Sequence, residues 1–572
     1  MCPNKRSDVK GKAETVETPE TAVSERLPAM IRRARRTRAL VVAVALALGL
    51  AACTSDDSAD DASSDNDASD AGAGIAPIGE STPPEYAALE IPDGRIDDAV
   101  DQLDDIAQNA LDQTGVPGMA IAVVHDDEVV YAKGFGIRET GTDEAVDADT
   151  VFQLASLSKP VGATVVAGVV GDGTVSWDDE VVQYLPDFAL SDPYVTEHVT
   201  IADLYSHRSG LPDHAGDLLE DLGYDRDEIL SRLRYEPLAP FRAEYAYTNF
   251  GVTTGAIAAA TAAGTPWEDL SEARLYEPLG MSSTSSRFAD YESNPGRAVT
   301  HQRVDGEWQP GEPRDADAQS PAGGVSSTAN DMAHWMRMVL ADGAFEGDQV
   351  VDPDALGAML TPQMVSNPPG TLASRAGSYG YGIGTGVDES GRVRFSHSGA
   401  FALGAATNFV MMPAENLGIV ALTNGMPIGL PEAVTASFMD VVTTGEVQRD
   451  WVSLFAELFA PLFENPSALA GQEPPSDPAP AQPDDAYVAT FANDYYGPAE
   501  VVASGDGLVL RLGPEALELP LTHWDGDTFS YEPPGENAVG ISAVTFTIGA
   551  DGRVAGVTVE NLDENGLGTF TR

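Results

Sequence analysis

The chain has 572 residues, too many for one ordinary domain, and a net charge of −58 from 90 acidic and 32 basic residues. Such a surface repels phosphates, so a nucleic-acid partner is excluded. Abundant acid with only two lysines after residue 52, Lys133 and Lys159, predicts a high-salt habitat, in which salt screens the self-repulsion; a merely acidic secreted protein is the alternative.

The N-terminal region has the pattern of a bacterial lipoprotein signal peptide. A basic segment at 30–38 is followed by an apolar run at 39–50, which is too short for a comfortable membrane span and ends in Leu-Ala-Ala before Cys53. Because this resembles a lipobox, we interpret residues 1–52 as a leader and expect Met30 to be the true start. Lipid on Cys53 would anchor the mature protein to the bacterial cell membrane, outside the cytoplasm; a short signal anchor with an incidental cysteine is the alternative.

The residues after the leader predict a tether and then the start of an ordered domain. Residues 53–90 contain a run of aspartates and no basic residue, which predicts a disordered, self-repelling segment. Apolar residues at helical spacing predict a helix over 95–111, and two apolar runs joined by a polar turn predict strands at 118–124 and 129–135. A further helix is expected from Ser156 to residue 170.

The middle of the chain predicts a helical excursion followed by three more strands. Residues 176–345 are mostly helical and loop-rich, and Thr328 with Asp331 three residues later forms a capping-box pattern before a helix over 332–340. The later strands are expected at 392–397, 405–412 and 417–423. Together the five strands predict an antiparallel sheet flanked by helices, with a helical lobe, in one α+β domain over residues 91–463.

The end of the chain predicts a linker and a second domain. Residues 464–485 are rich in Pro, Ala, Gln and Asp, which is typical of a linker. Residues 486–572 predict a small antiparallel β-barrel-like domain, because short strands alternate with Gly and Asp turns. Its expected strands are 501–502, 508–512, 528–531, 544–548 and 554–559.

Lys159 lies three residues after Ser156, at the predicted start of a helix. Elsewhere the chain uses mostly arginine for positive charge, and arginine stays protonated where a buried lysine can lose its proton. Residues three apart share a helix face, so the amine can take the proton of the Ser156 hydroxyl and leave a nucleophile. This motif alone can arise by chance, and its weight depends on partners further along the chain.

Two further motifs follow in order, a Tyr-x-Asn motif ending at Asn249 and a His-x-Gly motif beginning at His397. With Ser-x-x-Lys before them, they resemble the serine β-lactamase and penicillin-binding-protein superfamily over about residues 92–445. The resemblance is closest to class C β-lactamase-like hydrolases, a branch that includes D-alanyl-D-alanine carboxypeptidases, D-aminopeptidases and esterases. It implies the fold of that family, a serine β-lactamase/transpeptidase-like domain.

The resemblance also implies a role for each residue of the first two motifs. Ser156 would be the nucleophile, at a helix N-terminus whose dipole favours negative charge, and Lys159 would be the base for acylation. The Tyr247 phenol would pass a proton to the leaving group or activate the deacylating water. Asn249 would hydrogen-bond Lys159 and the substrate amide.

The third motif implies the edge that binds substrate. The backbone amides of Ser156 and Ala400 would form the oxyanion hole, and Ser398 and Gly399 would contact the substrate. Class C β-lactamases have Lys-Thr-Gly where this chain begins its motif with His397. A mostly neutral imidazole favours the tyrosine phenolate less than a lysine does, so efficient antibiotic hydrolysis is not expected. We expect a pH–rate limb tied to this histidine.

The sequence therefore predicts a membrane-tethered serine hydrolase that forms an acyl-enzyme on Ser156, with small peptides or amides of D-amino acids as substrates. Carboxylesterase and weak β-lactamase are alternatives within the class. A penicillin- or cell-wall-ligand-binding protein without turnover is the alternative of another class. No cofactor is expected, and no metal, because the other histidines form no ligand-spaced cluster. Segments of residues 486–572, among them Tyr495-Tyr496-Gly497, resemble the lipocalin-like domain of some members of this peptidase group.

Overall fold

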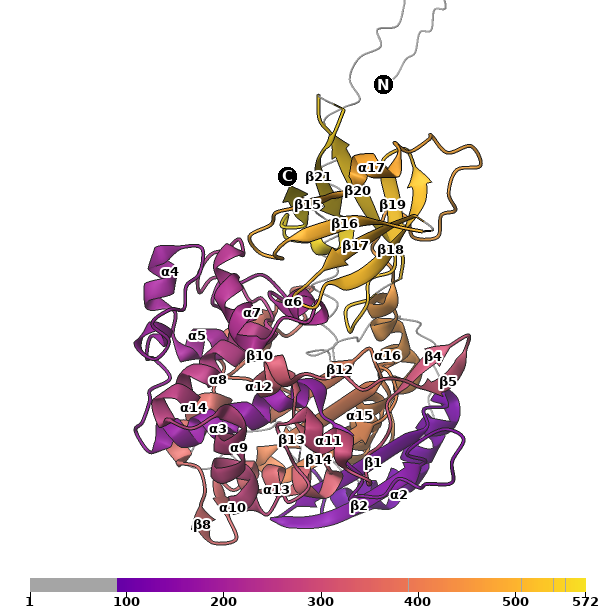
Figure 1. Ribbon diagram of the computed structural model, residues 1–572. Coiled ribbons are helices and arrows are strands. Elements are labelled where there is room, and N and C mark those ends of the chain that lie inside the picture. Colours follow the sequence, from indigo (N-terminus) through magenta and orange to yellow (C-terminus); the bar gives the residue numbers. More distant parts are fainter. Residues whose placement is uncertain (1–89, 389, 506, 539, 551) are drawn as a thin grey trace, which may run out of the picture.

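The computed structural model describes residues 90–572, apart from residues 389, 506, 539 and 551. The predicted leader, Cys53 and the predicted tether up to residue 89 lie outside the described residues. Figure 1 shows a larger part built of helices and strands, on which a smaller β-rich part stands, drawn in yellow. Among the helices of the described residues, none is long and apolar enough to cross a membrane.

The larger part is organised around one eight-stranded antiparallel sheet with the order β2-β1-β14-β13-β12-β11-β10-β9. The five predicted strands are confirmed as its first five positions, and three further strands extend it. The extra strands have only three or four residues, several of them Gly or Ser, so no apolar run marks them in the sequence. The bounds are β1 (Gly118–His125), β2 (Glu128–Gly136), β9 (Met364–Asn367), β10 (Gly377–Tyr379), β11 (Gly384–Val387), β12 (Val393–Phe401), β13 (Ala405–Met412) and β14 (Leu417–Thr423).

The two faces of this sheet bury separate cores, which is why its central strands are apolar throughout. On β1, Ile121 packs into one core and Ala122 into the other, as the alternation of side chains along a strand requires. Helices α2 (Arg95–Thr114) and α15 (Leu430–Thr444) pack together on the first face, and α13 (Ala329–Leu340) packs on the second.

The helical lobe follows β2 in the chain. The helix predicted from Ser156 begins two residues later, as α3 (Ser158–Gly171), because Ser156 lies in a 3-10 turn, η2 (Ala155–Leu157). The other helices of this region are α4 (Pro193–His198), α5 (Ile201–Tyr205), α6 (Asp217–Asp221), α7 (Arg226–Arg232), α8 (Asn249–Ala263), α9 (Trp267–Ser271), α10 (Glu277–Leu279), α11 (Phe288–Ser293), α12 (Ser320–Gly323) and α14 (Pro353–Leu360). Short strand pairs lie between them, β3 (Phe152–Gln153) with β6 (Ser326–Ser327), β4 (His301–Val304) with β5 (Glu307–Pro310), and β7 (Ala344–Phe345) with β8 (Asp348–Gln349).

Helix α13 begins three residues earlier than predicted. Thr328 caps it, because its hydroxyl accepts the Asp331 amide at 3.0 Å. The Asp331 carboxylate accepts the Ser283 amide at 2.9 Å and the Thr284 hydroxyl at 2.8 Å. The capping box predicted there therefore forms only its first bond, and the carboxylate ties the helix start to a neighbouring loop instead.

The smaller part is a second eight-stranded antiparallel sheet in simple chain order from β15 to β22. A bridge between Ala492 and Thr571 joins its first and last strands, so the sheet is a nearly closed barrel. The five predicted strands are present, and β15, β18 and β22 were not predicted. The bounds are β15 (Ala489–Phe491), β16 (Ala499–Ser504), β17 (Gly507–Leu512), β18 (Leu517–Asp525), β19 (Thr528–Tyr531), β20 (Ser542–Ile548), β21 (Val554–Val559) and β22 (Thr569–Thr571).

The barrel docks on the loop before α6 and on helices α6 and α7 of the larger part (Figure 1). The Tyr495 hydroxyl accepts the Gly216 amide at 3.0 Å, and the Tyr224 hydroxyl donates to the Tyr496 carbonyl at 2.8 Å. Arg232 donates to the Tyr495 carbonyl at 2.6 Å. Apolar side chains of both parts belong to one continuous core, so the two parts are packed as a unit.

The segment between the two parts, predicted as a linker, follows helix α16 (Trp451–Phe459) and the 3-10 turn η8 (Ala460–Phe463), and it contains no helix or strand before α17 (Asp484–Tyr487). It is tied to the barrel along its length. Asn465 donates to the Ile541 carbonyl at 2.9 Å, and the Ala479 amide donates to Asp525 at 2.7 Å.

Candidate active site

Ser156 sits in a tight turn between strand β3 and helix α3. The residue before it, Ala155, is fully buried and has φ +49°, in the left-handed region that side chains other than glycine rarely adopt. Backbone strain of this kind costs about 1–3 kcal/mol and persists where the surrounding packing enforces it, commonly at functional sites. The turn presents the half-buried Ser156 side chain at the start of α3.

Lys159 lies on the first turn of α3, fully buried, with three polar atoms around its amine. Its Nζ is 2.5 Å from Asn249 Oδ1, 3.0 Å from the Ala322 carbonyl and 3.2 Å from Ser156 Oγ. The first two atoms can only accept hydrogen bonds. A neutral amine has two N–H groups and one lone pair, so in that state its lone pair is left for the Ser156 hydroxyl.

Burial lowers the pKa of Lys159 to about 7; the charge of Asp217 opposes this shift, and the charge of Arg314 adds to it. An ordinary lysine would stay charged at neutral pH. Here the buried amine is neutral in a large fraction of molecules, which is the state that can accept a proton.

A pH–rate prediction follows from this pKa. A base must be neutral to act, so kcat/KM should rise with pH through an inflection near 7 and then level off. Steady-state kinetics on a small ester from pH 5 to 9 test this. A flat profile over that range would contradict the assignment of Lys159 as the base.

Asn249 connects Lys159 to a buried carboxylate that the sequence did not single out. Asn249 is the first residue of α8, and its Nδ2 donates to Asp217 Oδ2 at 2.8 Å. The same oxygen lies 2.9 Å from His214 Nδ1. Burial by itself lowers the pKa of His214, but the hydrogen bond and the charge of Asp217 outweigh it, and the pKa is raised. The spacing of three between His214 and Asp217 was the one sequence pattern that could have pointed to this buried pair.

Tyr247 is enclosed by other aromatic rings. The His207 ring lies against it, with 4.6 Å between the two ring centroids. The Lys159 amine also lies against it, with Nζ 4.5 Å from the centroid of the Tyr247 ring. Asp213 accepts its amide at 2.6 Å, which fixes the backbone. Its hydroxyl makes no hydrogen bond within the described residues. Burial raises the pKa of Tyr247 far above its usual range, and the nearby Ser156 hydroxyl only partly offsets this, so the phenol is protonated.

His397 lies on β12 and has both ring nitrogens occupied. Its Nδ1 is 2.7 Å from the Ser398 carbonyl, which can only accept, so Nδ1 carries the proton. Its Nε2 therefore accepts from the Tyr379 hydroxyl at 2.8 Å. Burial, with the charge of Lys159, lowers the pKa of His397 to about 3. Because burial keeps the His397 ring neutral over the working pH range, we now expect the pH–rate limb that the sequence tied to His397 to come from Lys159 instead.

The edge of β12 runs beside the Ser156 turn. Its partner β11 pairs only as far as Ser396, so within the described residues the stretch 397–401 has no strand neighbour on that side. A Cβ on Gly399 would lie 2.2 Å from the Leu154 carbonyl and 3.0 Å from the Ser156 amide, so only glycine lets the strand approach this closely. The exposed Ala400 follows at this edge.

Ser398 is placed differently from the expectation. Its hydroxyl accepts Asn408 Nδ2 at 3.0 Å, on the neighbouring strand, and it lies against the buried Glu432 carboxyl. Asn408 in turn accepts from Thr435 on α15 at 2.6 Å. The Ser398 side chain is therefore bonded on the side of the sheet that α15 covers, because successive side chains of a strand point to opposite faces.

The structure thus brings together the five residues that the motifs pointed to, from distant parts of the chain. Ser156 lies in η2 and Lys159 on α3, Tyr247 lies in the loop two residues before Asn249, the first residue of α8, and His397 lies on β12. Sequence reasoning missed Tyr379, which binds His397, and it missed Asp217 and Arg314. Within the described part of the chain, no three His, Cys, Asp or Glu side chains are grouped to hold a metal ion.

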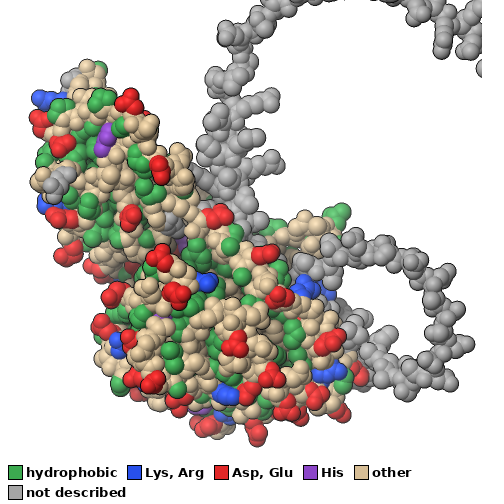
Figure 2. All heavy atoms as spheres, turned by 90° about the vertical axis from the view of Figure 1, so that its right-hand side faces the viewer, with side chains coloured by type: hydrophobic (Ala, Val, Ile, Leu, Met, Phe, Trp, Pro, Cys, Tyr) green, Lys and Arg blue, Asp and Glu red, His purple; other side chains and the backbone are tan. Residues whose placement is uncertain are grey.

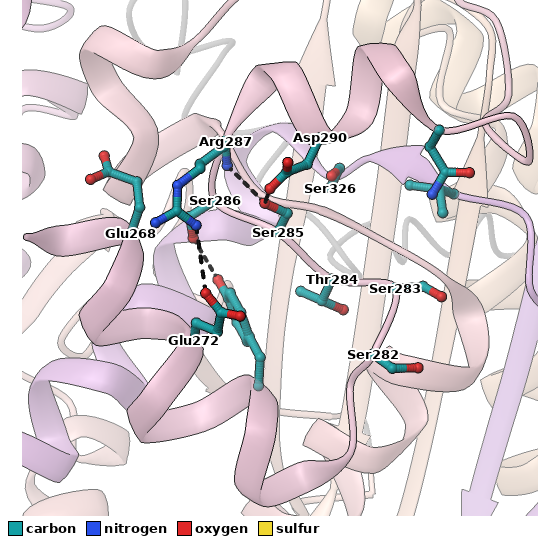
Figure 3. Close-up of a pocket in the computed structure, with 13 residues that line it drawn as sticks. Glu268, Glu272, Ser282, Ser283, Thr284, Ser285, Ser286, Arg287, Asp290 and Ser326 are labelled. Carbon is teal, nitrogen blue, oxygen red and sulfur yellow. Dashed lines mark hydrogen bonds and ion pairs between the residues drawn. The ribbon is translucent and has the colours of Figure 1, made fainter.

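A polar cavity of about 220 Å³ lies away from these residues, around the loop 282–287 (Figure 3). Its polar side chains bind one another. Ser285 donates to Asp290 at 2.6 Å, and Arg287 pairs with Glu272 at 3.6 Å. It contains none of the residues of the three motifs, and we assign it no function.

Comparison with protein families supports two units at the same places in the chain. The family model described as Beta-lactamase matches residues 103–442. A second model, described as Domain of unknown function (DUF3471), matches residues 473–568. The lipocalin-like interpretation of the barrel is not confirmed, because the family that it matches has no assigned function.

Relatives and solved structures agree with the first match. Penicillin-binding protein 4 of Amycolatopsis lactamdurans is 30% identical over 397 residues, which are 66% of this chain and 93% of that protein. The D-alanyl-D-alanine-carboxypeptidase/endopeptidase AmpH of Escherichia coli K12 is 25% identical over 350 residues, 60% of this chain and 89% of that protein. The octameric penicillin-binding protein homologue from Pyrococcus abyssi has a TM-score of 0.55 at 19% identity, covering 81% of this chain and 98% of that chain, which shows a shared fold.

Proposed function

The chain belongs to the Beta-lactamase family and is a serine hydrolase, and from this premise we propose that it cleaves small peptides or amides of D-amino acids through an acyl-enzyme on Ser156. The observation that carries the proposal is the environment of Lys159. Two acceptor atoms take its N–H groups, and its third neighbour is the Ser156 hydroxyl at 3.2 Å.

In the acylation step, Lys159 Nζ takes the proton of Ser156 Oγ as the oxygen bonds to the substrate carbonyl carbon. The carbonyl oxygen becomes negative and receives hydrogen bonds from the Ser156 and Ala400 amides. The ammonium formed on Lys159 lies over the face of Tyr247, where the ring stabilises the positive charge. Asn249 and the Ala322 carbonyl hold the amine in place.

When the carbon–nitrogen bond breaks, the leaving nitrogen needs a proton. The protonated Tyr247 phenol donates it and is restored from the Lys159 ammonium, so the serine proton ends on the leaving amine. A water then attacks the acyl ester, releases the acid and restores Ser156. His397 stays beside the tyrosine as a neutral ring, because burial lowers its pKa to about 3. Its Nε2 accepts a hydrogen bond from the Tyr379 hydroxyl.

Two observations favour D-amino-acid peptides or amides over β-lactams. One relative carries the name D-alanyl-D-alanine-carboxypeptidase/endopeptidase. The motif on β12 begins with a buried neutral histidine, where class C β-lactamases have lysine, so no cation assists the tyrosine from that strand.

An activity panel tests the substrate class. D-aminoacyl amides, D-alanyl-D-alanine peptides, short p-nitrophenyl esters and a chromogenic cephalosporin are compared by kcat/KM, with Ser156→Ala as the blank. We expect the D-amino-acid amides or peptides to lead. A cephalosporin kcat/KM well above the others would instead identify the protein as a β-lactamase. A labelled penicillin that stays on Ser156 without turnover would indicate a binding protein.

The mature protein is proposed to be anchored outside the cytoplasm by lipid on Cys53. The support is the basic segment, the apolar run and the Leu-Ala-Ala before the cysteine. We expect the protein to partition into detergent with membranes and its Cys53→Ala variant to lose lipid. A variant that stays equally membrane-bound would refute the anchor.

Adaptation to high salt is proposed from the charge. Removal of residues 1–52 would leave a net charge of −63, and acidic side chains are scattered over the face seen in Figure 2 with few basic ones among them. Unscreened repulsion destabilises the compact state, so Tm should rise substantially from dilute buffer to molar NaCl. The measurement is a thermal melt at NaCl concentrations from dilute buffer to molar, and an unchanged Tm would contradict adaptation to high salt.

A further inference from the structure

A glutamate of the barrel reaches into the larger part. Glu536 lies in the connection between β19 and β20, and its carboxylate is bound by groups of the other unit. Oε1 accepts the Ala402 amide at 2.6 Å, and Oε2 accepts the Leu403 amide at 3.2 Å. The Arg314 guanidinium lies 3.7 Å from Oε1. The side chains of Glu536 and Arg314 are 10% and 9% exposed, so this carboxylate is almost fully withdrawn from water.

The groups that hold this carboxylate adjoin the candidate active site. Ala402 and Leu403 directly follow β12, whose unpaired edge lies beside the Ser156 amide. The Arg314 backbone is bonded in both directions to the side chain of Gln153, three residues before the serine. Its guanidinium lies 4.7 Å from the ring centroid of Phe401, and its charge reaches the Lys159 amine, because it contributes to the lowered pKa of that lysine.

Two consecutive backbone amides and a guanidinium, which also pairs with Glu220, surround the Glu536 carboxylate. Backbone N–H groups that converge on one point bind anions, and a guanidinium adds a charge-assisted hydrogen bond or an ion pair. All three donors belong to the catalytic unit. Only the occupant, Glu536, comes from the barrel.

We propose that Arg314 and the Ala402 and Leu403 amides form a carboxylate subsite of the active site, and that Glu536 occupies it as a built-in competitor of a substrate carboxylate. The inference rests on the proposed function and names its substrate preference. With Glu536 in place, peptides whose carboxylate would reach this subsite bind poorly, and amides and esters without that carboxylate are favoured. The barrel then acts as a specificity element.

The loop that carries Glu536 has an anchor of its own, which makes the proposal testable. Asp221 accepts the Glu536 amide at 3.0 Å, the Asn537 amide at 3.1 Å and Asn537 Nδ2 at 2.8 Å. None of these bonds uses the Glu536 carboxylate. Arg314 also keeps Glu220 as an ion-pair partner when Glu536 is replaced. A Glu536→Ala variant therefore keeps its loop docked while the subsite is vacated.

The kinetic test compares one D-alanyl peptide with a free C-terminal carboxylate against the same peptide as its C-terminal amide. In Glu536→Ala, kcat/KM for the carboxylate form should rise roughly tenfold relative to the amide form, as expected for one gained charge-assisted contact. Glu536→Gln keeps the shape without the charge and should give a smaller rise. Glu532→Ala, an exposed glutamate of the same connection, is the control and should leave the ratio unchanged.

A second readout needs no peptide turnover. Propionate should stabilise Glu536→Ala in a thermal melt and inhibit its hydrolysis of a p-nitrophenyl ester, compared with chloride at the same ionic strength. Wild type and Glu532→Ala should show neither effect. An unchanged substrate ratio together with no propionate effect in a folded, active Glu536→Ala variant would overturn the subsite. Absence of turnover on every substrate by wild type would instead count against the proposed function.

Discussion

Lys159→Arg is expected to fold and to lose roughly 10²–10⁴-fold in kcat/KM, the range that a positioned general base contributes. A guanidinium stays charged at any working pH and has no lone pair to offer the Ser156 hydroxyl. The wild-type amine is fully buried with a pKa near 7, so it can exist in the neutral form. Steady-state kinetics on an ester substrate, beside a thermal melt, measure the effect.

Lys133→Arg is the matched control, because Lys133 is the other lysine of the described chain. Its side chain is 46% exposed on β2, and its amine pairs with Asp104 at 2.6 Å, a contact that arginine can also make. This variant should keep wild-type kcat/KM and stability. If Lys159→Arg retained most of the wild-type kcat/KM in a folded protein, Lys159 would not be the base.

Tyr247→Phe is expected to reduce amide cleavage far more than ester cleavage. Burial keeps the phenol protonated, so its role in the proposed mechanism is to donate a proton to the leaving group. An amine cannot leave without that proton, whereas p-nitrophenolate can. For a D-aminoacyl amide the loss in kcat/KM should be about 10²–10⁴-fold, and for the p-nitrophenyl ester of the same acyl group it should be small.

Tyr245→Phe tests whether the effect comes from the Tyr247 hydroxyl or from the surrounding aromatic cluster. Tyr245 contacts the rings of His207 and Tyr379, as part of the same cluster, but no motif assigns it a role. It should leave both activities near wild type. An equal loss on amide and ester by Tyr247→Phe would show that the phenol acts elsewhere, for example on the deacylating water.

The features that local sequence determined are those whose physical cause is itself local. Strands β13 and β14 begin and end where predicted, because their apolar runs are bounded by turn residues. The contact between Ser156 and Lys159 follows from a spacing of three at the start of a helix. Strands β9 to β11 were missed because they have no such run, and they are held in place by their neighbours.

The protonation states that the chemistry needs were decided only by the tertiary structure. A lysine is charged and a histidine is partly neutral in isolation, and it is burial that brings the pKa of Lys159 to about 7 and that of His397 to about 3. The partners that complete the site come from distant segments. Asp217 reaches Lys159 through Asn249, Tyr379 takes the lone pair of His397, and Glu536 arrives from a different unit. No local pattern records these contacts, because desolvation and hydrogen bonding across the fold depend on which surfaces the packing brings together.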